Sequence, residues 1–219
     1  MFIISLIANP GFLSFSLNPF GLLSPDSRIL LLLGATGTLP INQLHRWWTL
    51  LSANYLHAGL LHILFNMFAL YQIGQLVIQE YGGYRMFSIY TLSGVVGYWI
   101  SYLAGVRFTV GASAAVCGLI GATLYYARSR GGAYGQMIFG QVGGWVVAIF
   151  IFGLLVPGIN NWAHGGGLLA GALIGFLLGY EGKKPESFTH KFTAGVCVLA
   201  TLLVLVWAVL TTFYAFSQS

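Results

Sequence analysis

The strongest constraint on the fold is a series of apolar runs, each about as long as a helix that crosses a membrane. A hydrocarbon core takes roughly 20 residues of α-helix. Only 6% of the residues are charged and 58% are hydrophobic, a composition that excludes an ordinary soluble domain. Six runs, bounded by charges, prolines or glycine clusters, predict membrane-spanning helices at 59–80, 85–104, 112–128, 137–157, 161–180 and 192–216.

The first apolar run, residues 1–23, is less regular. Asparagines, prolines and a glycine interrupt it at 9–11 and 18–19, so it predicts a short or irregular span. It has no basic region and no clean small-residue cleavage site, and we expect it to be retained. The segment 24–58 that follows holds two tryptophans and a tyrosine, which favour a partly embedded interfacial loop.

These features predict one all-α polytopic membrane protein, a six-helix bundle with one appended carboxyl-terminal transmembrane helix. The core is expected at 1–180, a polar cytoplasmic linker at 181–191 and the seventh helix at 192–219. The chain contains 30 glycines, and small residues allow membrane helices to approach closely.

The net charge of +5 does not indicate nucleic-acid binding, because the basic residues are scattered among short connections. Lysine and arginine concentrate in cytoplasmic loops. With a cytoplasmic amino terminus, three basic residues lie outside and six lie inside, namely Arg85, Arg128, Arg130, Lys183, Lys184 and Lys191. We therefore expect that orientation, in a bacterial inner membrane.

Four polar residues are expected to lie at one depth in the membrane, where such groups are costly and often mark function. His62 and Asn66 are four residues apart and share one helix face. Ser113 opens the fourth span and His164 lies near the start of the sixth. Because these three spans run from the outside inward, all four side chains should lie just below the outer surface.

Small residues predict how the fourth and sixth spans meet. They recur at every fourth position, as Gly167, Gly171, Gly175 and Gly179 on the sixth span and as Ala114, Gly118 and Ala122 on the fourth. Such stripes permit close helix contact. His164 precedes Gly167 by three residues and therefore projects from the same face, toward Ser113.

This arrangement suits acyl transfer by a serine nucleophile. A neutral imidazole within hydrogen-bond reach can take the serine proton, so we expect Ser113 as nucleophile and His164 as base. The four acidic residues lie in loops or at span ends, which predicts a dyad without an acid. Asn66, His62 and a backbone amide at the helix start can stabilise the oxyanion, and Gly111 leaves a route for water.

No cofactor or metal is expected, because the sequence has no His-Glu-x-x-His motif and no carboxylate at membrane depth. Taken singly, each residue has an ordinary interpretation. A serine in a membrane helix usually bonds to the carbonyl one turn back, and His62 and Asn66 could be polar contacts between helices. His57 is expected to border the membrane surface. The coincidence of four such residues at one depth favours a site.

Three motifs resemble those of the rhomboid family of intramembrane serine proteases. They are 56–66, which contains His57, His62 and Asn66, then 111–122 around Ser113, and 163–171 around His164. The resemblance implies Ser113 as nucleophile, His164 as base, His62 and Asn66 on the oxyanion side and Gly111 shaping the preceding loop. It also implies cleavage of single-pass membrane proteins, without metal or ATP.

Three positions depart from the family pattern. Ala114 replaces a common glycine, Thr49 a common arginine after Trp48, and Cys117 an aromatic residue that packs on the catalytic imidazole. Two other functions stay open at this point. One is an inactive relative that binds transmembrane segments; the other is a small-solute transporter, for which the sequence lacks an inverted-repeat signal.

Overall fold

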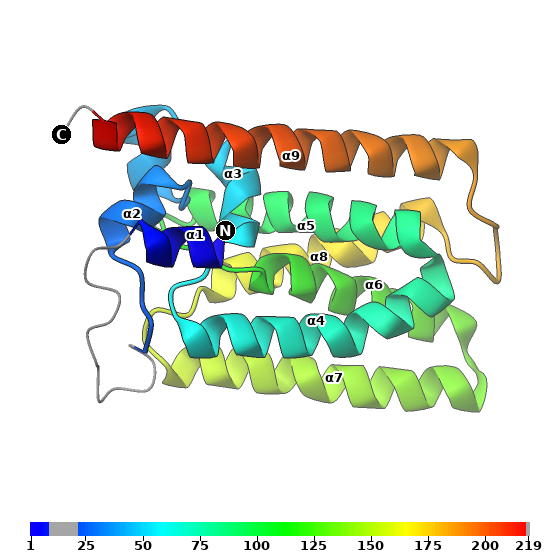
Figure 1. The fold of residues 1–219 in the computed structure, drawn as a ribbon. Coiled ribbons are helices and arrows are strands. Elements are labelled where there is room, and N and C mark those ends of the chain that lie inside the picture. The colour runs from blue at the N-terminus through cyan, green and yellow to red at the C-terminus, as the bar shows by residue number, and fades with distance from the viewer. Residues whose placement is uncertain (9–21, 218–219) are drawn as a thin grey trace.

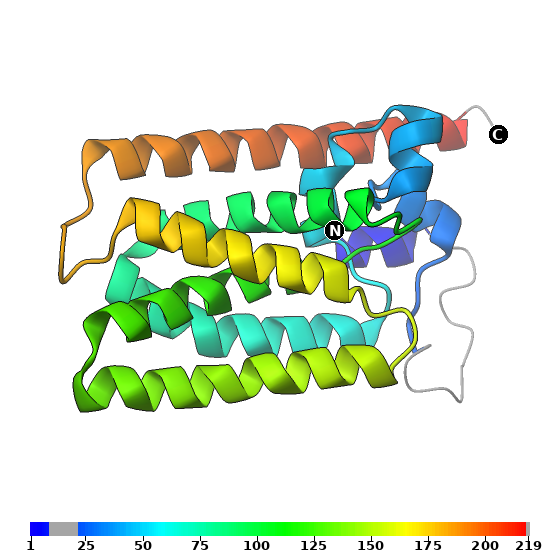
Figure 2. The ribbon, with the colours of Figure 1, turned by 180° about the vertical axis from the view of Figure 1, so that it is seen from behind.

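The computed structural model describes residues 1–8 and 22–217, and its long elements are six helices that run side by side (Figures 1 and 2). No strand occurs in these residues, so the predicted all-α fold is confirmed. Each of the six helices lies over one of the six predicted apolar runs, with bounds that differ by up to five residues; the last begins at Phe188, within the predicted linker 181–191. They are α4 Leu60–Tyr81, α5 Gly83–Leu103, α6 Ser113–Arg130, α7 Gly132–Leu155, α8 Asn161–Leu178 and α9 Phe188–Ser217.

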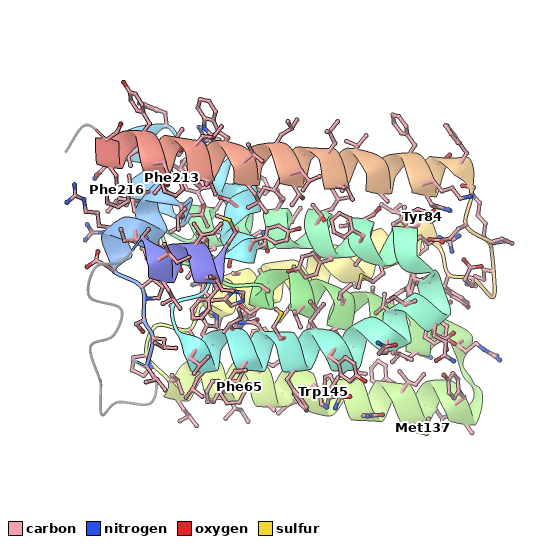
Figure 3. All side chains as sticks on the ribbon, viewed as in Figure 1. Phe65, Tyr84, Met137, Trp145, Phe213 and Phe216 are labelled. Carbon is pink, nitrogen blue, oxygen red and sulfur yellow. The ribbon has the colours of Figure 1, made fainter. Side chains whose placement is uncertain are left out.

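Four of these helices, α4, α7, α8 and α9, are long and apolar enough to cross a membrane. Exposed apolar side chains cover their outer faces, Met137 on α7 among them (Figure 3). Helices α5 and α6 are less apolar, because their surroundings differ. Helix α6 contacts α4, α5, α7 and α8, and most of its residues are buried. An interior helix meets neighbouring helices rather than lipid and needs less hydrophobicity.

The centre of the bundle is the contact between α6 and α8, where the predicted small-residue stripes meet. A Cβ on Gly167 would overlap the carbonyl of Ala114, and one on Gly171 would overlap the backbone of Gly118. Only glycine allows these backbones to come so close. Gly179 differs from the prediction, because it ends α8 with φ +69° and has open space beside it.

The segment before α4 forms short elements at the Ser113 end of the bundle. These are α2 Ser27–Leu32, a π-helical turn Leu39–Gln43, α3 Thr49–Ser52 and a 3-10 turn Ala53–Tyr55. Thr36 exchanges both backbone hydrogen bonds with Thr109, and Thr49 Oγ1 lies 3.1 Å from Thr36 Oγ1. The segment is thereby fastened to the loop that leads into Ser113.

The amino-terminal helix α1, Phe2–Ile7, lies at the same end of the bundle (Figure 1). Met1 and Ile4 pack against a hydrophobic cluster that contains Leu30 and Leu33, which belong to the segment before α4. Leu22 also lies there, because its carbonyl accepts a hydrogen bond from the Leu60 amide. Residues 9–21 fall outside the described part of the chain, and the expected first span stays a prediction.

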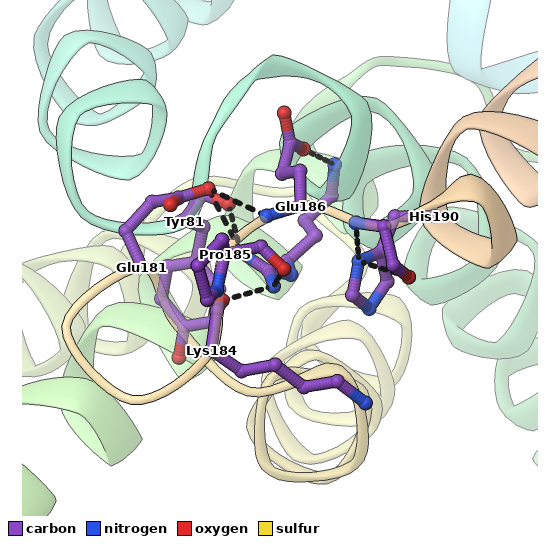
Figure 4. Close-up of polar contacts among 8 residues, drawn as sticks. Tyr81, Glu181, Lys184, Pro185, Glu186 and His190 are labelled. Carbon is purple, nitrogen blue, oxygen red and sulfur yellow. Dashed lines mark hydrogen bonds and ion pairs between the residues drawn. The ribbon is translucent and has the colours of Figure 1, made fainter.

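A buried arginine organises the opposite end, where α8 connects to α9, and Figure 4 shows its partners Tyr81, Glu181, Lys184 and Pro185 there. Arg85, near the start of α5, is 0% exposed. Its guanidinium donates to the carbonyls of Tyr81, Lys184 and Pro185 and to Glu181 Oε1 at 3.1 Å. This chain segment, predicted as a polar linker, is therefore held closely against α5.

Candidate active site

Ser113 and His164 meet at the head of the α6–α8 contact. Ser113 is the first residue of α6 and His164 the fourth of α8, and Ser113 Oγ lies 3.0 Å from His164 Nε2. The histidine is buried, while the serine is partly exposed. This distance is within hydrogen-bond range, and it depends on the glycines that let the two helix backbones touch. The structure brings together the two residues that the sequence singled out.

Gly111 lies directly against the ring of His62, beside this pair. Its φ of +133° is a conformation that residues with a side chain rarely adopt. A Cβ at Gly111 would lie 2.6 Å from His62 Nε2 and 3.7 Å from Ser113 Oγ. The absence of a side chain at Gly111 therefore lets the His62 ring pack closely against the backbone, on the side of Gly111 that also faces Ser113 Oγ.

The hydrogen bonding of His62 determines what it presents to that space. Its Nδ1 accepts a hydrogen bond from the Ala58 amide at 3.2 Å. A neutral imidazole carries one proton, so the Nε2 of His62 is the protonated nitrogen. His62 can therefore donate a hydrogen bond beside Gly111.

Asn66 lies on the same face of α4 but is bonded within its own helix. Its Nδ2 donates to the His62 carbonyl at 2.8 Å, and the side chain is buried. No hydrogen bond from Asn66 to Ser113 or His164 occurs among the described residues. Direct donation to an oxyanion stays a prediction for Asn66, while its support of the turn that carries His62 is plain.

The pair has no acidic third member among the described residues. His164 Nδ1 is buried without a hydrogen-bond partner there. Asp26 accepts from the Arg28 amide at the start of α2, and Glu181 pairs with Arg85 at the opposite end of the bundle. Cys117 is also buried, one turn after Ser113, and does not bond to the imidazole.

His57 lies closer to the site than the sequence indicated. Its ring meets the ring of His62 edge-on, with centroids 5.2 Å apart, and is only 4% exposed. Burial, followed by the proximity of His62, lowers the pKa of His57 to about 3. Its expected position at the border of the membrane surface stays a prediction. Its only signal in the sequence is its place in the motif 56–66, five residues before His62.

Tyr98 of α5 is a second neighbour that the sequence did not indicate. Its hydroxyl donates to the Gly111 carbonyl at 2.5 Å, and its ring is 2% exposed. It is one of many aromatic residues in the apolar runs, so nothing in the local sequence distinguishes it.

Comparison with known proteins gives one consistent family. Residues 44–181 match the profile described as the Rhomboid domain. Rhomboid protease GluP of Bacillus subtilis (strain 168) is 33% identical over 181 residues, which cover 81% of this chain and 34% of that protein. RHOMBOID-like protein 6, mitochondrial, of Arabidopsis thaliana is 35% identical over 177 residues, covering 80% and 56%.

A relative described as inactive also matches. Inactive RHOMBOID-like protein 8 of Arabidopsis thaliana is 30% identical over 170 residues, which cover 75% of this chain and 47% of that protein. The chain spans between one third and just over half of the length of these three relatives.

Proposed function

The chain belongs to the rhomboid family, and from that premise we propose that it is an intramembrane serine endopeptidase. It is an integral, polytopic membrane protein. The observation that carries the proposal is the 3.0 Å approach of Ser113 Oγ to His164 Nε2, with His62 Nε2 packed against the neighbouring Gly111.

The proposed reaction begins with attack on a peptide carbonyl. Ser113 Oγ bonds to the carbonyl carbon while its proton passes to His164 Nε2, and the carbonyl oxygen becomes an oxyanion. The Nε2–H of His62 and the amides that open α6 donate to this oxygen. Expulsion of the amine takes the proton from His164 and leaves an acyl-enzyme. Water then attacks the ester by the reverse sequence of proton transfers.

The proposed substrates are single-pass transmembrane proteins cleaved near the membrane surface. Two features support this choice. The dyad lies at the ends of α6 and α8, within about a turn of the loops, and the outer helix faces are apolar. A water-soluble peptide would have to leave its hydration shell to reach the buried His164.

The orientation follows from the charges at the two ends. Arg85, Arg128 and Lys184 lie at the end opposite Ser113, so that end is proposed to be cytoplasmic, with the dyad near the outer surface of a bacterial inner membrane. Helix α1 packs at the Ser113 end. The proposal therefore puts α1 on the outer side of the membrane. The cytoplasmic amino terminus expected from the sequence differs, because that expectation requires residues 1–23 to cross the membrane.

Reconstitution in liposomes with a single-pass substrate tests the function. We expect the parent protein to cleave it and Ser113→Ala to reduce cleavage at least a thousandfold. Serine-reactive fluorophosphonate should label the parent at Ser113 and should fail to label a His164→Ala variant. Ser93→Ala, which changes a buried serine of α5, is the matched control and should cleave normally.

An absence of cleavage would also be informative, because one similar protein is described as inactive. If the parent neither cleaves nor reacts with fluorophosphonate while remaining folded, the protease proposal is wrong. Binding of the uncleaved transmembrane segment would then favour a non-catalytic role.

A further inference from the structure

We infer that Tyr98 is a positioning residue that fixes the peptide between Gly111 and Ala112, so that the amides of Ala112 and Ser113 are held toward the oxyanion. This inference rests on the proposed function. It gives a role to a buried hydroxyl that lies outside the three motifs of the sequence.

The hydrogen bond from Tyr98 acts on one peptide group. The hydroxyl donates to the Gly111 carbonyl at 2.5 Å. In a planar trans peptide the carbonyl and the following N–H point in opposite directions. Fixing the carbonyl of Gly111 therefore also fixes the direction of the Ala112 N–H, away from Tyr98.

A second bond holds the same residue from its other side. The Gly111 amide donates to the Ala53 carbonyl at 2.9 Å. Both polar groups of Gly111 are thus occupied, and the two bonds restrain a residue that, without a side chain, has more conformational freedom than any other. By contrast, the amides of Ala112 and Ser113 have no hydrogen-bond partner among the described residues, as groups reserved for a ligand would.

The Tyr98 ring reinforces this arrangement from behind the dyad. It packs in one small cluster with Ala53, Ala114 and Ala163. Ala114 follows Ser113, and Ala163 precedes His164. The ring thus contacts the neighbours of both proposed catalytic residues, while its hydroxyl reaches the loop that forms the oxyanion site. Among the described residues Tyr98 makes no hydrogen bond to Ser113 or His164, so its hydroxyl acts through the backbone.

Tyr98→Phe tests the hydroxyl without removing the ring. Tyr90→Phe is the matched control, because Tyr90 is also buried in α5 and its hydroxyl contacts the backbone carbonyl of Asn54 at 3.5 Å. In liposomes, with active sites counted by fluorophosphonate labelling, we expect Tyr98→Phe to lower kcat about tenfold and to change KM less than about twofold. Tyr90→Phe should change neither.

A pair of inhibitors separates positioning from a general structural role. A peptide aldehyde forms a hemiacetal with the serine and needs the oxyanion donors, whereas the corresponding peptide alcohol does not. Tyr98→Phe should weaken aldehyde binding about tenfold and leave alcohol binding unchanged.

Two results would overturn the inference. If the parent is active but Tyr98→Phe matches Tyr90→Phe in kcat per active site and in aldehyde affinity, Tyr98 has no positioning role and the proposed function stands. If the parent itself neither cleaves substrate nor binds the aldehyde, both the proposed function and this inference are wrong.

Discussion

The two ends of the bundle each contain a buried polar centre, and they differ in how fully it is bonded. At one end, the guanidinium of Arg85 reaches four acceptors, and its amide reaches Glu186 Oε1 at 2.9 Å. At the other end, His164 Nδ1 and both ring nitrogens of His57 are buried without a partner among the described residues.

This difference separates polar groups that stabilise the fold from polar groups that are available for a reaction. An unpaired buried polar atom costs about 1–3 kcal/mol, so it persists where another requirement outweighs stability. A nearly saturated cluster such as the one around Arg85 contributes rigidity instead. Changes at the Arg85 end should therefore affect folding, and changes at the Ser113 end should affect the reaction.

The largest effect is expected from Arg85→Met. The change leaves three backbone carbonyls without their donor, and each carbonyl that stays buried and unpaired costs about 1–3 kcal/mol. Glu181 also loses its partner, but its side chain is 38% exposed and water can solvate it. Denaturant or thermal unfolding in detergent would measure this loss. Arg128→Met makes the same substitution at an exposed position of the same end and should cost less than about 0.5 kcal/mol. If Arg85→Met instead lowered the cleavage rate per labelled site and left stability unchanged, the Arg85 end would serve the reaction and not the fold.

Gly111→Ala should have the next largest effect, on the reaction. The new Cβ would lie 2.6 Å from His62 Nε2 and would displace that ring, so we expect a loss of about a hundredfold in kcat/KM. Gly105→Ala is the control, because Gly105 also has a positive φ, +82°, but open space around it. Both variants place a side chain at a positive φ, so Gly105→Ala shows the effect of backbone strain alone. Equal activity in the two variants would show that the reaction does not need the His62 ring in its position against Gly111.

The smallest effect concerns pH and His57. Its folded pKa of about 3 lies below the ordinary value of 6.5, so the unfolded chain binds more protons between these values. Stability should therefore fall as pH drops below about 6.5. His57→Phe should remove about 2 kcal/mol of the loss between pH 7.5 and 5. Unfolding measured at the two pH values checks this; His45→Gln, at an exposed position, should behave like the parent.

The sequence predicted the six long helices and the α6–α8 contact well, because both depend on local composition. Apolar runs identify the helices, and the spacing of Gly167 and Gly171 identifies the contact face. The meeting of Ser113 with His164 followed from these two predictions, since helices of known direction and face leave little freedom for their first residues.

Other features could not be predicted, because they depend on contacts between distant segments. Tyr98 bonds to a carbonyl 13 residues away, and Arg85 collects acceptors about 100 residues later in the chain. Neither residue has a local pattern that marks its partner. The burial of His57 likewise depends on tertiary structure, because the loop that carries it folds back onto α4.

The path of α9 has a consequence for the order in which the protein matures. This helix is synthesised after every residue of the site, yet it packs on α5, α3 and α2. Helix α3 leads directly into Ala53, whose carbonyl anchors Gly111. We therefore expect a ribosome-bound chain that lacks α9 to hold Ser113 and His164 without the full support of the segment that anchors Gly111.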